Sequence, residues 1–305
     1  MKIINDIFKF YSDSPTVVSV GKFDGVHKGH KLLCERMKPF ADEGMVRCMV
    51  TFDVPPSNRI EHTEKKVIIS EEERELLLEK SGMDIICILN FSDKIRKMSP
   101  EDFINLLSEH LCMKAMVVGS DFKFGYKGSG NTKLLTELSE KNGFSLQIVE
   151  KLKSQNKDIS STLIRELIST GDIEEANSLL GYDYYVYGKI VHGNRIGHTI
   201  GVPTINIVPP PEKLLPPNGV YVSKVIIKGR TYHAVTDVGT KPTVSDNGSI
   251  IVESHILDYS ENIYEENARV CFLKFLRPEK KFDDVKALGN QIKSDIKQTL
   301  AYFSK

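Results

Sequence analysis

The amino-acid sequence predicts two consecutive domains, a parallel α/β sheet with helices on both faces followed by an antiparallel β sheet or barrel. Strand-like and helix-like segments alternate through roughly the first 180 residues, which is typical of a parallel sheet. The pattern then changes to short runs rich in β-branched and aromatic residues, separated by turn sequences. The length of 305 residues is about twice that of a common domain, and we place the boundary at Gly181, giving domains 1–181 and 182–305.

The expected elements of the first domain follow one another as strand–helix units. The run Val17-Val18-Ser19-Val20 predicts a buried strand that ends at Gly21. A later helix begins at Ser70, because this capping residue precedes three glutamates in the first turn, and it ends near Gly82. The other predicted elements are strands at 46–52, 85–89 and 114–118 and helices at 30–41, 100–111 and 162–168. Ligands of such sheets bind at the carboxyl ends of the strands.

The second domain is predicted from its strands, its turns and its final helix. Proline, asparagine and glycine form the turns, for example in Pro216-Pro217-Asn218-Gly219. The stretch 282–303 is amphipathic and is predicted to close the domain as a helix. The predicted strands cover 184–190, 219–227, 232–238 and 250–257.

Composition and charge exclude several classes of protein. The 41 lysines and arginines balance 41 aspartates and glutamates, and no basic helix or patch is visible, so we expect no nucleic-acid partner. The longest apolar run, 85–89, is far shorter than the roughly 20 residues of a membrane helix, and the start lacks the apolar stretch of a signal peptide. Five cysteines without a C-x-x-C pair argue against a zinc site and a disulfide framework. We therefore expect a cytoplasmic protein with no membrane contact and no obligatory protein partner.

A glycine-rich segment with two histidines lies between the first predicted strand and the first helix. Its sequence, Gly21-Lys-Phe-Asp-Gly-Val-His-Lys-Gly-His30, lets the backbone approach a ligand and offers the free N–H groups of a helix start to an anion. His27 and His30 bracket that start and can both donate to phosphate oxygens. The Walker pattern is absent. These features outweigh the simpler interpretation of a glycine-rich turn and predict a phosphate site of the nucleotidylyltransferase type.

Two further segments of the first domain carry candidate binding residues. Ser160, Ser161 and Thr162 cap the helix that contains Arg165, and together they suit a pyrophosphate group, although an ordinary helix cap would use the same hydroxyls. The segment 117–125 ends a strand and contains Asp121, Phe122 and Phe124. Asp121 could orient a sugar hydroxyl or ring amide, and the phenylalanines could line an aromatic ligand. An ordinary turn with core phenylalanines is an equally good interpretation.

The second domain has one dense motif and one unexpected carboxylate. The glycines Gly193, Gly197 and Gly201 belong to a loop able to fold over phosphates, or to a polar hairpin. Thr204 and Asn206 are two residues apart on an extended segment and so share a face, where their oxygens suit Mg²⁺. Glu253 lies in an apolar strand, and from the residues alone a solvent-facing position is the simpler interpretation.

Taken together, the motifs resemble those of the prokaryotic bifunctional riboflavin kinase/FMN adenylyltransferases, also called bifunctional FAD synthetases. The resemblance runs in the family's order from Gly21 almost to the C-terminus. It includes G-x-F-D-G-V-H-x-G-H at 21–30, V-G-x-D-F-x-F-G at 118–125, I-S-S-T-x-I-R at 159–165, G-x-P-T-x-N at 201–206, G-T-K-P-T-V at 239–244, V-E-x-H-x-L-D at 252–258 and F-L-R-x-E-x-K-F at 275–282.

The resemblance implies a Rossmann-like nucleotidylyltransferase domain followed by a six-stranded β-barrel riboflavin kinase domain with a C-terminal helix. It also implies two steps that use ATP and Mg²⁺: riboflavin is phosphorylated to FMN in the second domain, and FMN is adenylylated to FAD in the first. Glu253 is then the general base of the kinase, Thr204 and Asn206 hold Mg–ATP, and the loop with Gly193, Gly197 and Gly201 covers the phosphates. In the first domain, the implied catalytic residues are His27, His30 and Arg165, the flavin-binding residues are Asp121, Phe122 and Phe124, and the other ATP-binding residues are Gly21, Phe23, Asp24, Gly25, Gly29, Ser160, Ser161 and Thr162.

The sequence departs from the family pattern at four places. The segment Asp53-Val54-Pro55-Pro56 lacks a histidine that the family usually has, and Asp158 stands where an arginine is common. Glu265 replaces a usual glycine and Lys241 an arginine. The first two departures lie beside the adenylyl site, where an added carboxylate should weaken phosphate binding.

The alternatives are therefore a riboflavin kinase with an impaired first domain or a non-catalytic flavin-binding regulator. Transfer to pantetheine phosphate or nicotinate mononucleotide would explain the first motif but not the second domain.

Overall fold

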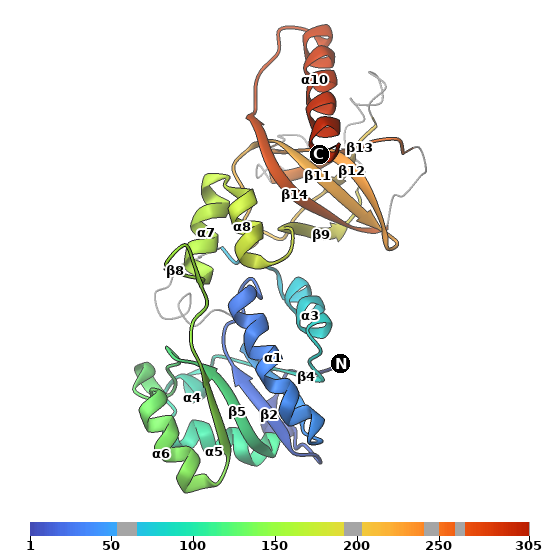
Figure 1. Cartoon of the computed structure of the whole chain (residues 1–305). Helices are drawn as coiled ribbons and strands as arrows, with labels where there is room; N and C mark the ends of the chain where they lie inside the picture. The colour runs from blue at the N-terminus through green and yellow to red at the C-terminus, as the bar shows by residue number, and fades with distance from the viewer. Residues whose placement is uncertain (54–65, 192–202, 241–249, 260–265, 305) are drawn as a thin grey trace. The chain divides into compact units, whose positions relative to one another are not determined.

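The computed structural model describes residues 1–53, 66–191, 203–240, 250–259 and 266–304. By contacts between its residues, the chain divides into two compact units, Met1–Ser161 and Thr162–Lys305 (Figure 1). Within the described part, no helix combines the length and the apolar character needed to cross a membrane.

The first unit is built on a six-stranded sheet in which every pair of neighbouring strands is parallel, as the sequence predicted. Four of its strands match predicted segments to within two residues at each end. The two edge strands were not predicted. In spatial order the strands are β1 (Lys2–Ile4), β4 (Ile85–Leu89), β3 (Val46–Phe52), β2 (Thr16–Val20), β5 (Met113–Gly119) and β6 (Ser145–Val149).

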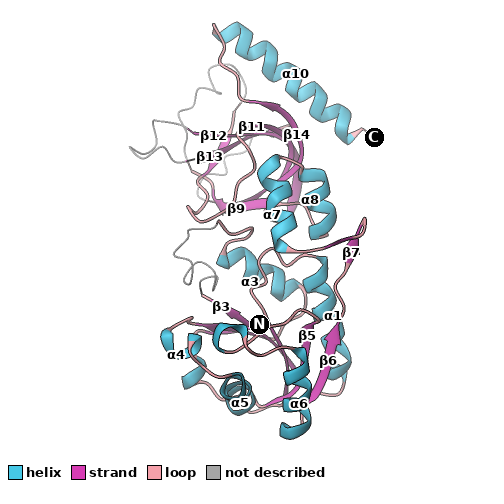
Figure 2. Ribbon diagram, turned by 90° about the vertical axis from the view of Figure 1, so that its left-hand side faces the viewer, coloured by secondary structure: helices cyan, strands magenta, loops and turns pink. Residues whose placement is uncertain are grey.

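Helices cover both faces of this sheet. Successive side chains of a strand point to opposite sides, and strands such as β2 and β4 are buried at every residue, so both faces need a covering layer. Val18 and Val20 of β2 share one core with buried residues of helices α4 (Asp93–Arg96), α5 (Pro100–Leu111) and α6 (Thr132–Asn142). Helix α1 (Lys28–Asp42) packs on the other face, and Figure 2 shows the helices on either side of the strands.

Helix α3 (Glu71–Lys80) begins where its sequence predicted. The Ser70 hydroxyl accepts a hydrogen bond from the Glu73 backbone N–H at 3.2 Å, and the Glu73 carboxylate accepts one from the Ser70 N–H at 2.9 Å. This reciprocal pair satisfies two N–H groups that a helix start otherwise leaves open.

The second unit contains a six-stranded antiparallel sheet that nearly closes into a barrel. The Val191 N–H donates to the Asn206 carbonyl at 2.9 Å and so joins the two edges. The longest strand, β14, was not predicted as a strand. In spatial order the strands are β10 (Ile205–Ile207), β13 (Ile250–Ile256), β12 (Arg230–Thr240), β11 (Gly219–Ile227), β14 (Asn267–Pro278) and β9 (Tyr185–Lys189).

Two helices, α7 (Ser161–Thr170) and α8 (Ile173–Leu180), precede the barrel. Helix α8 packs against β14, and the Asn177 side chain connects it to the barrel backbone. The Asn177 amide donates to the Phe272 carbonyl at 2.9 Å and accepts from the Tyr184 N–H at 2.7 Å. By these contacts, α8 belongs with the strands that follow it.

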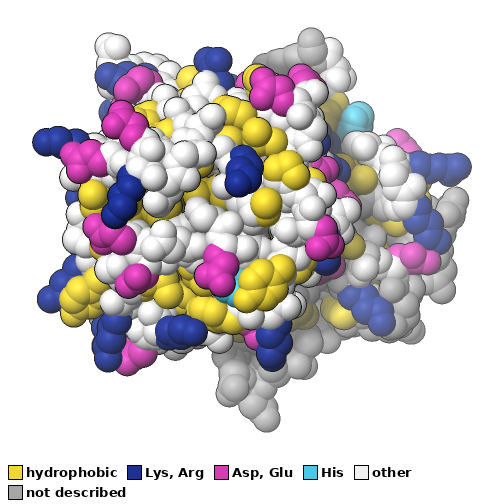
Figure 3. All heavy atoms as spheres, turned by 90° about the horizontal axis from the view of Figure 1, so that it is seen from below, with side chains coloured by type: hydrophobic (Ala, Val, Ile, Leu, Met, Phe, Trp, Pro, Cys, Tyr) yellow, Lys and Arg dark blue, Asp and Glu magenta, His cyan; other side chains and the backbone are white. Residues whose placement is uncertain are grey.

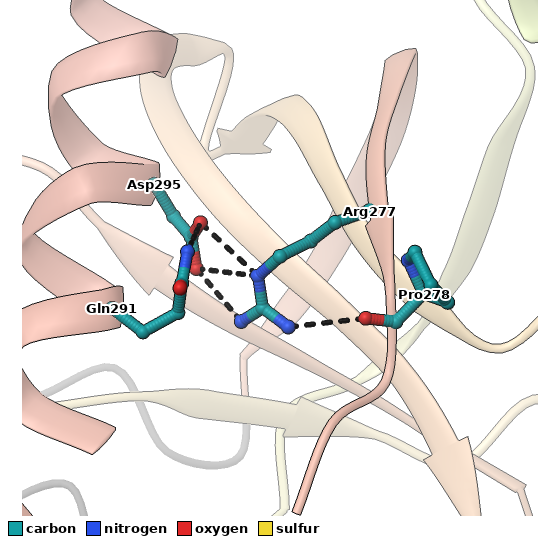
Figure 4. A network of polar contacts seen from close by, with 4 residues as sticks. All are labelled: Arg277, Pro278, Gln291 and Asp295. Atoms are coloured by element: carbon teal, nitrogen blue, oxygen red, sulfur yellow. Dashed lines mark hydrogen bonds and ion pairs between the residues drawn. The ribbon is translucent and has the colours of Figure 1, made fainter. Parts of the chain in front are cut away.

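The predicted closing helix is present as α10 (Val285–Phe303), and its start at residue 282 is corrected by three residues. The Asp284 side chain accepts a hydrogen bond from the Ala287 N–H at 2.7 Å and caps the helix, so Phe282 lies outside it. Arg277 of β14 holds α10 through Asp295, with N–O distances of 3.1, 3.1 and 2.8 Å (Figure 4). The Gln291 amide donates to the same carboxylate at 2.9 Å.

Charged side chains of both signs are interspersed with apolar ones on the face shown in Figure 3. That face carries no large patch of a single sign, in keeping with 41 positive and 41 negative residues in the chain.

Candidate functional site

The glycine-rich segment 21–30 connects β2 to α1 at the carboxyl edge of the parallel sheet. Gly25 has a φ of +93°, a conformation that L-residues rarely adopt. A Cβ atom at Gly29 would lie 3.1 Å from ring atoms of His27, so glycine gives the imidazole room there. The Asp24 carboxylate accepts hydrogen bonds from the Ile68 and Ile69 N–H groups at 2.8 and 3.3 Å. Asp24 was predicted to bind ATP, and in the structure its side chain fixes the loop 21–30 to residues 68–69.

His27 and His30 lie together at the start of α1. Their rings stack at 3.7 Å between centroids with 17° between the planes, and the Phe23 ring meets His30 edge-on at 5.1 Å. The Nδ1 atoms of both histidines are buried and have no hydrogen-bond partner among the described residues. Burial lowers the pKa of His27 to about 4 and holds the pKa of His30 well below its usual value. At neutral pH both rings are therefore uncharged hydrogen-bonding groups.

The predicted pyrophosphate segment begins helix α7 at Ser161. The Ser161 hydroxyl donates to the Asp24 carbonyl at 2.7 Å, so the helix start lies against the loop that carries the histidines. A helix start presents free N–H groups to an anion. Thr162 and Arg165 follow in the same helix and belong to the second unit.

The predicted flavin-binding residues lie in the turn after β5, where the Phe122 N–H donates to the Gly119 carbonyl at 3.0 Å. Phe122 is partly exposed and its ring stacks on that of Phe124 at 5.3 Å, whereas Phe124 is only 5% exposed and belongs to the core. The Asp121 carboxylate lies 2.9 Å from the Lys151 ammonium. Of the three residues, Asp121 and Phe122 remain accessible to a ligand.

Two charged residues of the first unit were missed by sequence reasoning. Lys151 joins Asp121 to Asp158, at 2.9 and 3.5 Å. Arg74 on α3 donates to the Phe52 carbonyl at 3.3 Å, at the end of β3, and burial lowers its pKa. Neither lies in a motif, and only the three-dimensional contacts connect them to the site.

A second polar group lies on one face of the barrel. Asn206 of β10 is the direct neighbour of Glu253 on β13, and the Thr204 hydroxyl donates to the Glu253 carboxylate at 2.6 Å. Neighbouring residues of paired strands share a face, so the three predicted kinase residues are brought together. The register also places Asp237 of β12 beside Glu253, which the sequence did not predict.

The oxygens of this group suit a hard cation. Hydroxyl, amide and carboxylate oxygens are the ligands that Mg²⁺ takes in proteins. The described residues contain no group of three or more histidine, cysteine, aspartate or glutamate side chains placed to hold a metal. Thr204 and Asn206 are the residues of this group that could offer oxygens to such a cation. The glycines Gly193, Gly197 and Gly201, with Pro55, Lys241 and Glu265, lie outside the described residues.

Known proteins match both halves of the chain. A family model described as FAD synthetase matches residues 10–163, and one described as riboflavin kinase matches residues 180–303. A bifunctional riboflavin kinase/FMN adenylyltransferase from Listeria monocytogenes is 35% identical over 97% of this chain and 95% of its own length. The protein of the same name from Bacillus subtilis is 33% identical over 95% of this chain and 93% of its length.

The fold is also shared with a solved structure from Streptococcus pneumoniae. It is 31% identical to this chain, covers 97% of each chain and superposes with a TM-score of 0.86. That structure is described as a macrolide-efflux protein, which differs from the names of the curated relatives.

Proposed function

The chain belongs to the family of bifunctional riboflavin kinase/FMN adenylyltransferases, and on this premise we propose that it makes FAD from riboflavin in two steps that each consume ATP. The observation that carries the proposal is the presence of two separate polar groups, one in each unit. The first is the histidine pair at the start of α1, and the second is the group of Thr204, Asn206 and Glu253.

In the kinase step, the 5′-hydroxyl of riboflavin attacks the γ-phosphorus of ATP. Glu253 takes the hydroxyl proton, the bond between the γ-phosphorus and the bridging oxygen breaks, and ADP leaves with FMN as the product. The 2.6 Å hydrogen bond from Thr204 fixes the orientation of the Glu253 carboxylate. Thr204 and Asn206 would hold Mg²⁺, which neutralises charge on the phosphates when it is bound.

In the adenylyl step, a phosphate oxygen of FMN attacks the α-phosphorus of a second ATP. The bond between the α-phosphorus and the bridging oxygen breaks, pyrophosphate leaves, and FAD is formed. His27 and His30 are neutral in the free protein, so they stabilise the developing charge by donating hydrogen bonds, His27 from a buried position and His30 from a half-buried one. Gly21, Gly25 and Gly29 let the backbone approach the nucleotide.

The helix start with Ser160, Ser161 and Thr162 would bind the β- and γ-phosphates, with Arg165 one turn further along. Asp121 and Phe122 would contact the flavin, and Phe124 would support Phe122 from the core.

We assign adenylyl transfer to residues 1–181 and riboflavin phosphorylation to residues 182–305. The family matches at 10–163 and 180–303 support this division. We further expect the enzyme to act in the cytoplasm, without a nucleic-acid, membrane or obligatory protein partner.

The first test is a chromatographic time course of the purified chain with riboflavin, ATP and Mg²⁺. FMN should rise and then be replaced by FAD. FMN that accumulates without FAD, even when FMN is supplied directly, would identify a kinase with an impaired first domain. The absence of both products would favour the flavin-binding regulator.

Two variants then test the division of labour. Glu253→Gln should abolish FMN formation and keep FAD formation from supplied FMN. His30→Ala should do the opposite, because it removes one hydrogen-bonding ring from the adenylyl site only. If either variant lost both activities while remaining folded, the division would be wrong.

A further inference from the structure

Lys151 connects two segments of the first unit that are far apart in the sequence. It follows strand β6, and its ammonium lies 2.9 Å from the Asp121 carboxylate and 3.5 Å from the Asp158 carboxylate. Asp121 belongs to the turn after β5. Asp158 ends the short strand β8 (Lys157–Asp158), three residues before helix α7 begins at Ser161. One side chain thus bridges the two edges of the proposed adenylyl site.

The position of Asp158 makes its charge important. The start of α7 attracts anions through its free N–H groups and its dipole, so a carboxylate just ahead of it competes with a bound phosphate. An ammonium at 3.5 Å offsets part of that repulsion, because water screens a pair whose side chains are 35% and 45% exposed. Lys151 remains charged, because its hydrogen bond to Asp121 raises its pKa.

The contact with Asp121 fixes the ammonium in place. Asp121 lies at the carboxyl end of β5 and is anchored there with its neighbour Ser120, whose N–H donates to the Val149 carbonyl at 2.9 Å. The Ser120 hydroxyl also donates to the Glu150 carboxylate at 3.1 Å. These contacts hold the end of β5 beside the end of β6, so Asp121 and Lys151 stay adjacent and the lysine remains on the side facing Asp158.

We propose that Lys151 is a positioning residue for adenylyl transfer, which keeps the start of α7 able to bind the phosphates of ATP by neutralising Asp158. The proposal rests on the proposed function of the first unit. It explains how the chain accommodates an aspartate just ahead of its phosphate-binding helix. A purely structural ion pair on the surface is the alternative, since pairs this exposed commonly contribute little to stability.

The test compares Lys151→Met with Lys157→Met, a matched control that removes a charge from the same hairpin. Lys151→Met should raise the KM for ATP in FAD formation by about threefold to tenfold, as expected for one partly screened charge near an anion, with a smaller change in kcat. Lys157→Met should leave the KM within about twofold. FMN formation by the second unit should be unchanged in both variants, and a thermal melt followed by circular dichroism should show that the first unit remains folded.

The double variant Lys151→Met/Asp158→Asn separates electrostatic positioning from a structural role. It should restore the KM for ATP, because no carboxylate is left to neutralise, and Lys151→Arg should behave like the unmodified chain. An unchanged KM in Lys151→Met would overturn the proposal. So would a loss that Asp158→Asn fails to restore.

Binding of pyrophosphate, measured by calorimetry, tests the proposal without turnover, since only the adenylyl step releases this product. Lys151→Met should weaken pyrophosphate binding by the same factor as it raises the KM for ATP. Adding Asp158→Asn to Lys151→Met should restore the pyrophosphate affinity. If the unmodified chain formed no FAD, the proposed function would fail on its own, and the calorimetry would still decide the role of Lys151. Equal affinities in the two chains would refute it.

Discussion

Removing Asp295 should destabilise the second unit by about 3 kcal/mol. The Asp295 side chain is 2% exposed and receives three contacts from Arg277 and one from Gln291. Breaking a buried pair by removing one partner costs about 3–5 kcal/mol, because the other charge loses its compensation. The lower end applies here, since Arg277 is 21% exposed and keeps its hydrogen bond to the Pro278 carbonyl at 3.1 Å.

A urea titration of Asp295→Ala checks this value. With a slope of about 2 kcal/mol per molar urea for a unit of this size, the midpoint should fall by about 1.5 M. Kinase activity should be followed alongside circular dichroism, because two units need not unfold in a single transition.

The double variant Arg277→Met/Asp295→Leu provides the control. It should cost less than Asp295→Ala alone, since it leaves no buried charge without a partner. A midpoint shift below about 0.3 M for Asp295→Ala would refute this reasoning, as would a double variant less stable than the single one.

Three other predictions follow from the site and from the core. The pKa of His27 is about 4 in the folded chain against about 6.5 when unfolded, so the unfolded state binds the proton more readily between these values. Stability should therefore be lost as the pH falls from 6.5 towards 4, and calorimetric melting of His27→Asn should show a weaker loss; an equal loss would contradict the assignment. All five cysteines are free thiols and four of them are buried; burial raises the pKa of Cys34 to about 11 and that of Cys87 to about 12. A thiol reagent at pH 8 should therefore label Cys112 first, and it should label all five cysteines only after the chain unfolds. Chelation by EDTA should stop FMN formation until Mg²⁺ is restored, and Thr204→Val should raise the Mg²⁺ concentration required; an unchanged requirement would exclude Thr204 as a ligand.

The sequence predicted the elements whose signals are local. The strand at 85–89 and the helix at 100–111 agree with the structure residue for residue, because a continuous apolar run marks the first and Ser99-Pro100 marks the start of the second. Strand β1 (Lys2–Ile4) is too short to show a periodic pattern. Strand β14 was missed because charged residues such as Arg269, Lys274 and Arg277 interrupt its apolar pattern, and their partners lie elsewhere in the chain.

The same distinction applies to the candidate site. The spacing of His27 and His30 placed both at one helix start, which the structure confirms. Their neutral state depends on how deeply the folded chain buries them, which no spacing reveals. Lys151 and Asp237 reach the site only through strand pairing, since Lys151 follows β6 and Asp237 lies beside Glu253 by the register of β12 on β13.

Helix α7 has a consequence for how the two activities can be separated. The contact boundary between Ser161 and Thr162 falls inside the segment 159–165, so Ser161 is counted with the first unit and Arg165 with the second. A gene cut after residue 161 would deprive the first product of Arg165. A cut after residue 181 would instead take Asn177 from the barrel and leave the Phe272 carbonyl and the Tyr184 N–H without their partner. We therefore expect a fragment of residues 182–305 to be less stable than one that keeps α8, because two of its backbone groups lose the side chain that pairs them.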